Sequence, residues 1–162
     1  MDYQRNLANK INKEGVVMSD ATDNKPSTNF WIIGVAALIW NLLGIVIYVG
    51  QVTMSPEALA RLTEDQQNLI TSTPVWANAA WAIAVNAGAF GSLLMLLRKG
   101  LAVPLFLISL IAIVIQDLEA FVLRDAYGVV GINSLIIPSM VFVIAIALVL
   151  YSRAAKSKGW LS

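Results

Sequence analysis

The sequence contains no cysteine and no histidine, and this absence limits the chemistry open to the chain. Without these residues there can be no disulfide, no thiolate or imidazole metal site, no cysteine nucleophile and no Ser-His-Asp triad. We therefore expect no metal, no cofactor and no enzymatic activity. Charged residues are also scarce, at 13% of 162 residues with a net charge of +1. No basic field of the kind that attracts nucleic acid is present.

Apolar residues are abundant, at 58% of the sequence with a mean hydropathy of +0.72. This composition is too apolar for an ordinary soluble domain. Four apolar runs each approach the roughly 20 residues that a helix needs to cross about 30 Å of hydrocarbon. They predict an all-α integral membrane protein, a four-helix bundle over residues 30–152 with spans at about 30–50, 75–97, 101–123 and 129–151. We expect a disordered polar tail at 1–29 and a basic tail at 153–162.

The connection between the first two spans carries a helix signal. Ser55 can cap a helix whose first residue is Pro56. The residues that follow place leucines such as Leu59 opposite acids such as Glu57. We expect a short amphipathic helix in this connection, lying at the membrane surface.

Basic residues are divided unequally between the two ends of the spans. Nine of the eleven flank the spans at the two chain termini and between spans two and three, whereas only Arg61 and Arg124 lie on the other side. Cytoplasmic segments of membrane proteins are enriched in lysine and arginine. Both termini are therefore predicted to be cytoplasmic, which places the other two connections in the periplasm.

Small residues recur at helical spacing inside the spans. Helices in a bilayer gain nothing by hiding apolar surface from water, so small and polar residues mark the faces that meet. We predict close helix packing at Gly34, Gly44, Ala80, Ala84, Gly88 and Ser92. The result should be a compact bundle. Span two carries two such ridges, which leaves one available for a partner protein.

The polar residues of the spans gather toward the predicted periplasmic half. We predict a polar pocket facing the periplasm, formed by Asn41, Tyr48, Gln51, Asn78, Asn86, Gln116, Glu119 and Asn133. Asn41 and Asn86 fall near the middle of their spans. For these two amides, a hydrogen bond between helices competes with a contact to a solute.

Asp117 and Glu119 are the only carboxylates near the end of an apolar run. In one interpretation span three ends near Ile115, and both acids lie among lipid headgroups with Arg124 as a screened partner. In the other, Gln116 and Glu119 face the bundle, where a buried Glu119 can exchange protons. Asp117 lies about 100° around the helix from Gln116, so a paired acid-base site is not implied.

Several motifs together suggest a family. These are Trp40-Asn41-x-x-Gly44, Pro74-x-Trp76, Arg98-Lys99 before a proline-containing span, Ser109-Leu110 with Gln116, and the ending Lys158-Gly159-Trp160. Over residues 28–162 the chain resembles a group of small bacterial four-span proteins that automated naming often labels "sugar transporter". The resemblance implies the bacterial inner membrane and no defined mechanism. The chain departs from the group after Gln116, where it has Asp117-Leu118-Glu119 in place of aromatic and amide residues.

Two functions remain open at this stage, and in both the chain resides in a lipid bilayer. The first is transport of a small solute of unknown identity through the periplasmic pocket. Four spans leave little room for a path, so a homo-oligomer is expected for this function. The second is an accessory or assembly role in a larger membrane complex, based on the second small-residue ridge of span two.

Overall fold

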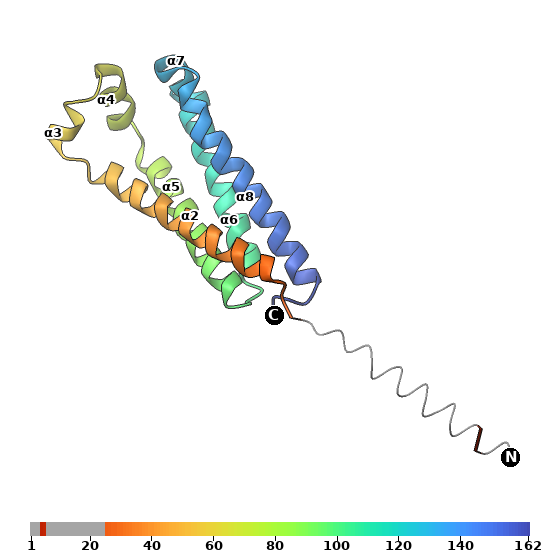
Figure 1. The fold of residues 1–162 in the computed structure, drawn as a ribbon. Helices are drawn as coiled ribbons and strands as arrows, with labels where there is room; N and C mark the ends of the chain where they lie inside the picture. The colour runs from red at the N-terminus through yellow and green to blue at the C-terminus, as the bar shows by residue number, and fades with distance from the viewer. Residues whose placement is uncertain (1–3, 6–24) are drawn as a thin grey trace.

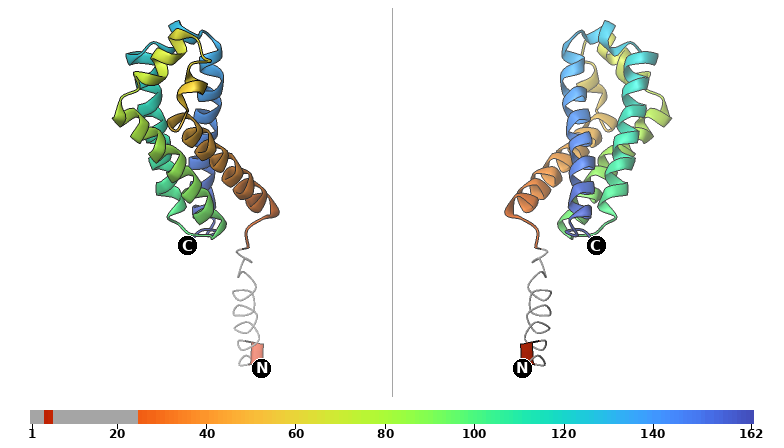
Figure 2. Two further views of the ribbon diagram at one scale, coloured as in Figure 1. Left: turned by 90° about the vertical axis from the view of Figure 1, so that its left-hand side faces the viewer. Right: turned by 90° about the vertical axis from the view of Figure 1, so that its right-hand side faces the viewer.

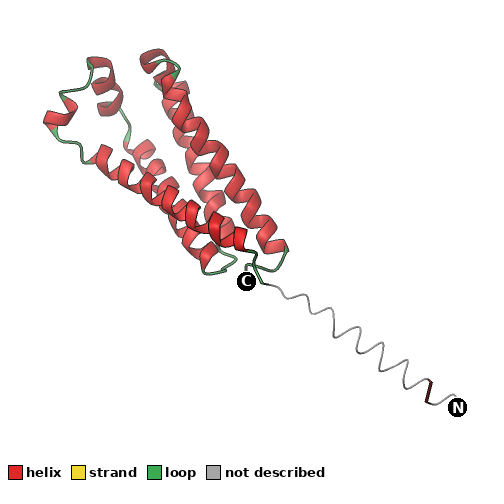
Figure 3. Ribbon diagram, in the orientation of Figure 1, coloured by secondary structure: helices red, strands yellow, loops and turns green. Residues whose placement is uncertain are grey.

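The computed structural model describes residues 4–5 and 25–162, with the exception of the Asn133 side chain. Most of the predicted tail 1–29 therefore lies outside the described residues. All regular elements of the described part are helices (Figures 1 and 3). The long ones are α2 (Thr28–Val52), α5 (Val75–Leu96), α6 (Ala102–Leu118) with its π-helical continuation η1 (Glu119–Leu123), and α8 (Asn133–Ser157). The short ones are α3 (Pro56–Leu59), α4 (Glu64–Thr71) and α7 (Ala126–Val130).

Four of these helices are long and apolar enough to cross a membrane, which confirms the prediction of an all-helical chain with four spans. The segments are Thr28–Val52, Val75–Leu96, Ala102–Leu123 and Ser134–Ser157. The first three lie close to their predicted bounds. The fourth helix begins at Asn133, later than the predicted residue 129, because a turn at Gly131 separates it from α7. Gly131 has a φ of +75°, in the left-handed region that favours glycine.

The four long helices form a bundle that is only partly closed. α5 packs against both α2 and α6, and α6 packs against α8. α2 crosses the other helices at an angle, as Figures 1 and 2 show, and makes at most marginal contact with α8. The bundle is therefore less compact than predicted, and the space between α2 and α8 is where a site can form.

Small side chains explain the close packing of α5. Its buried residues are Ala77, Ala80, Ala84, Ala87, Gly88, Ala89, Gly91, Ser92 and Met95. A Cβ at Gly88 would meet Asn41 of α2 and Ser109 of α6, and one at Gly91 would meet Phe106 of α6. Both small-residue ridges of α5 are thus occupied inside this chain. The ridge that we expected to be free for a partner is not free.

The two glycines of α2 predicted to pack closely both contact α5. Gly34 is buried, and a Cβ there would meet the side chain of Leu96. Gly44 lies against Val85. A Cβ added at Gly44 would lie 3.4 Å from the nearest methyl carbon of Val85. Both glycines therefore face α5: Gly34 lies against its last residue, and Gly44 lies against its middle.

At the end of the molecule that holds the C-terminus, hydrogen bonds and a ring contact join the last residues to the α5–α6 turn and to α2. The backbone N–H of Gly100 donates to the Ser162 carbonyl at 2.8 Å, and the Ser162 N–H donates to the Arg98 carbonyl at 2.8 Å. The Trp160 ring meets Phe30 of α2 edge to face, with centroids 5.8 Å apart. Residues 153–162, predicted as a tail, instead continue α8 to Ser157 and then fold back onto the α5–α6 turn.

Two short helices occupy the connection between α2 and α5. The Ser55 hydroxyl accepts from the Ala58 N–H at 3.2 Å, and Pro56 is the first helical residue, as the sequence predicted for this start. α4 begins with a capping box in which the side chains of Thr63 and Gln66 each accept from the other's backbone N–H. Both helices lie at the end of the molecule opposite the C-terminus (Figure 1).

Candidate functional site

A cleft of about 370 Å³ lies among all four long helices. Most of its wall is apolar, and three of its apolar residues are strongly exposed: Leu43 and Ile47 on α2, and Ile137 on α8. Because α2 makes at most marginal contact with α8, this exposed rim opens the cleft sideways. On a membrane-spanning protein, apolar residues exposed in this way face lipid.

Two of the polar side chains in the cleft already have partners. The Asn41 amide nitrogen donates to the Ala37 carbonyl at 2.8 Å and to the Ser92 hydroxyl of α5 at 3.3 Å. The Ser109 hydroxyl donates to the Ala84 carbonyl at 2.7 Å, which joins α6 to α5. The bond between helices that we considered for Asn41 is therefore present. These two residues fix helix register as well as lining the cleft.

Among the residues that the structure describes, Asp117 is the only charged one that lines the cleft. It is half-buried and lies about 22 Å along the helical rise from the start of α6. With the residues that the structure describes, the carboxylate of Asp117 forms no hydrogen bond and no ion pair. An ionised carboxylate in such a place lacks compensation from the protein, which is costly at membrane depth.

A smaller cavity of about 120 Å³, here called the outer cavity, adjoins the cleft. Gln51, Trp81 and Gln116 line both spaces. The outer cavity is also lined by Asn78 and by Glu119, so it brings together four of the residues predicted to form a polar pocket. These four come from α2, α5 and the continuous segment α6–η1.

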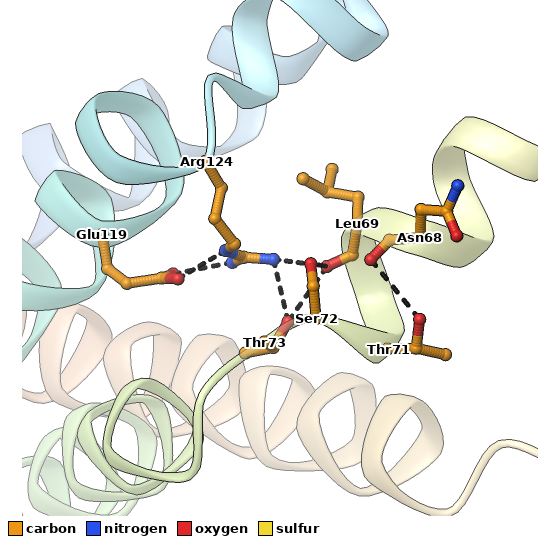
Figure 4. A network of polar contacts seen from close by, with 7 residues as sticks. All are labelled: Asn68, Leu69, Thr71, Ser72, Thr73, Glu119 and Arg124. Carbon is orange, nitrogen blue, oxygen red and sulfur yellow. Dashed lines mark hydrogen bonds and ion pairs between the residues drawn. The ribbon is translucent and has the colours of Figure 1, made fainter.

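Glu119 and Arg124 form a paired group at the wall of the outer cavity (Figure 4). Nε and Nη2 of Arg124 donate to the two carboxylate oxygens of Glu119 at 2.5 and 2.7 Å. Nη1 of Arg124 also donates to the Leu69 carbonyl and, at 2.9 Å, to the Thr73 hydroxyl. Since Glu119 is only 1% exposed, this arrangement holds a nearly buried ion pair.

The π-helical turn explains how these two side chains meet. Residues five apart diverge on an α-helix, whereas the wider turn of a π-helix pairs positions i and i+5. In η1 the Arg124 N–H donates to the Glu119 carbonyl at 3.2 Å. The same spacing brings the guanidinium to the carboxylate. It also carries the guanidinium to the end of α4, so that Glu119, Arg124 and Thr73 link three segments.

The two acids thus take different roles from those expected. Glu119 faces the bundle, as one interpretation held, but Arg124 occupies both of its oxygens. Asp117, which the helical spacing places about 100° around the helix from Gln116, lines the cleft together with Gln116. The carboxylate available to a solute is therefore Asp117.

Three other residues of the predicted pocket lie elsewhere. Tyr48 packs its ring edge to face on Trp81, with centroids 5.2 Å apart, and is not among the residues that line either space. Asn86 is exposed and donates to the Ala82 carbonyl of its own helix at 2.8 Å. The Asn133 side chain lies outside the described part of the structure.

The sequence did not single out Trp40 and Trp81 as site residues, yet both line the cleft. A signal was present, because these two tryptophans lie away from the predicted span ends where aromatic belts occur. An indole in the interior of a span needs another explanation, and both of these indoles form part of the wall of the cleft. Arg124 was considered only as a screened partner of the acids.

The four apolar helices make the chain a multi-pass membrane protein. No protein-family model, curated protein or solved structure matches it. In the described part of the chain, no group of three or more acidic or other ligating side chains is placed to hold a metal ion. The arrangement can hold a small solute between Asp117, the amides of Gln51 and Gln116, and two indoles.

Proposed function

We propose that the protein binds a small solute in the cleft and moves it across a bacterial inner membrane. The observation that supports this best is Asp117, an unpaired carboxylate on the wall of a cleft built by all four spans. Ionisable residues inside membrane spans are costly, and they mark solute and ion pathways. Gln51 and Gln116 add polar groups that form no hydrogen bond with the described residues.

We propose an orientation with both termini in the cytoplasm. The end formed by the start of α2, the α5–α6 turn and the C-terminus carries most of the basic residues, among them Arg98, Lys99 and Arg153. The opposite end carries α3 and α4, whose leucines would rest on the periplasmic membrane surface. In this orientation the Phe30–Trp160 contact closes the cytoplasmic side while the cleft lies toward the periplasm.

Four helices enclose little volume, so we propose that copies of the chain associate to complete the path. The alternative role, as an accessory subunit of a larger complex, was based on a spare ridge of α5. That ridge is buried by α2 and α6. We therefore prefer the transport function.

A cysteine placed in the cleft should react with a water-soluble thiol reagent. The natural chain has no cysteine, so any labelling of a single-cysteine variant comes from the introduced thiol. Val141 lines the cleft on α8, whereas Val143, two residues on, is 64% exposed on the outer surface. The thiolate attacks the sulfenyl sulfur of a methanethiosulfonate, forms a mixed disulfide and releases methanesulfinate, and thiolates form only where water reaches. We expect Val141→Cys to react with 2-hydroxyethyl methanethiosulfonate at least about tenfold faster than Val143→Cys in proteoliposomes.

The two variants differ only in the face of α8 that carries the thiol, so depth and local sequence are matched. The rate is measured by mass spectrometry after quenching at fixed times. Equal slow rates for the two thiols would mean that water does not enter the cleft, and the proposed solute site would then be abandoned.

A further inference from the structure

The charge inside the cleft is unbalanced. Within the described part of the chain, Asp117 is the one charged residue that lines the cleft, and the neighbouring acid Glu119 is already neutralised by Arg124. The three donor nitrogens of Arg124 are all engaged, by Glu119, the Leu69 carbonyl and Thr73. Among the described residues, no lysine or arginine lines the cleft to form an ion pair with Asp117. A ligand with one positive charge would supply what the protein lacks.

The rest of the cleft suits an apolar body. Trp40 and Trp81 present indoles to it, and indole faces attract cations, organic ammonium groups in particular. Aliphatic residues of all four long helices form most of the remaining wall. The lateral rim of Leu43, Ile47 and Ile137 gives a ligand dissolved in the lipid a way in.

We propose that the solute is an organic monocation with an apolar body, held by Asp117 against the two indoles. This inference rests on the proposed function and specifies the ligand class of the same cleft. An anion would meet the charge of Asp117 without a compensating donor from lysine or arginine. A sugar would need hydrogen bonds around its whole ring, whereas the polar groups of the cleft are few and two of them are already engaged.

Binding of tetraphenylphosphonium, a lipophilic monocation, tests the proposal. The full chain is purified in mild detergent, and binding of the labelled cation is measured by equilibrium dialysis at about pH 8, where carboxylates are ionised. We expect saturable binding that weakens at least about tenfold in Asp117→Asn, because the charge is lost while the shape is kept. Trp40→Leu should weaken it about threefold to tenfold through the lost cation–π contact.

The matched control is Asp125→Asn. Asp125 is an exposed acid beyond η1 that caps α7 by accepting from the Gly128 N–H at 3.2 Å. Asparagine can make the same cap and tolerates its φ of +48°. This variant should bind tetraphenylphosphonium as the natural chain does. Tetraphenylborate, an anion of the same shape, should bind more weakly to the natural chain and gain affinity in Asp117→Asn.

The outcomes separate this inference from the proposed function. If Val141→Cys reacts as expected but tetraphenylphosphonium binds equally to the natural chain and to Asp117→Asn, the cleft admits solutes and the cation assignment is wrong. If Val141→Cys is unreactive, the proposed function fails first. Circular dichroism of each variant shows whether it has kept its helices, so that a loss of binding is assigned to the site.

Discussion

Replacing Arg124 by alanine is expected to destabilise the protein by about 3 kcal/mol, the lower end of the range for breaking a buried ion pair. The loss arises because the carboxyl group of Glu119, only 1% exposed, would be left buried without the partner that holds both of its oxygens. The substitution also removes the donors that reach the Leu69 carbonyl and Thr73. Unfolding in mixed micelles of increasing SDS content, followed by circular dichroism, measures the change in the free energy of unfolding.

The double variant Glu119→Ala/Arg124→Ala should lose less free energy of unfolding than the sum of the two single variants, since neither side chain is then buried without its partner. Arg61→Ala serves as the control because Arg61 is an exposed arginine in the turn between α3 and α4. It should change stability by less than about 0.5 kcal/mol. A loss below about 1 kcal/mol for Arg124→Ala would instead describe a pair wetted by headgroups, as one interpretation of the sequence held.

The four spans could be predicted from the sequence because each depends on the summed hydropathy of about 20 residues, which tolerates local exceptions. The packing face of α5 could be predicted for a related reason. Alanines and glycines such as Ala80, Ala84 and Gly88 recur at helical spacing, and small residues are what membrane helices bring together. The course of the chain after α8 was less predictable, because Ser162 is held by backbone hydrogen bonds to the distant Arg98 and Gly100.

The site was only partly predictable, for geometric reasons. Gln51, Asn78, Gln116 and Glu119 do come together around the outer cavity. The role of Asp117 depends on the separation of α2 from α8, and no local pattern specifies how far two distant helices stand apart. The partner of Glu119 depends on a π-helical turn, whereas the sequence was interpreted with α-helical spacing. Trp40 and Trp81 lie away from the span ends where aromatic belts occur, and this position was the sequence signal for their place in the cleft wall.

Gly88→Ala should produce the other large loss of stability, about 1–3 kcal/mol, because an added methyl group overpacks the α2–α5 contact. Its Cβ would lie 2.0 Å from Oδ1 and 2.8 Å from Cγ of Asn41, and 3.3 Å from the Ser109 hydroxyl. The Asn41 side chain would have to turn away, which breaks its bond to Ser92 across the two helices. SDS unfolding again gives the free energy.

A second substitution decides whether Asn41 is the cause. In an Asn41→Ala background, the same Gly88→Ala change should cost less than about 1 kcal/mol, since the atoms it would strike are gone. Gly50→Ala is the matched control, because a Cβ at Gly50 meets nothing within 4 Å and Gly50 is also helical. That change should be neutral or stabilise by up to about 1 kcal/mol through helix propensity. If Gly88→Ala costs the same with and without Asn41, then Ser109 and the helix backbones set the spacing of the bundle, and the amide bond between α2 and α5 only follows it.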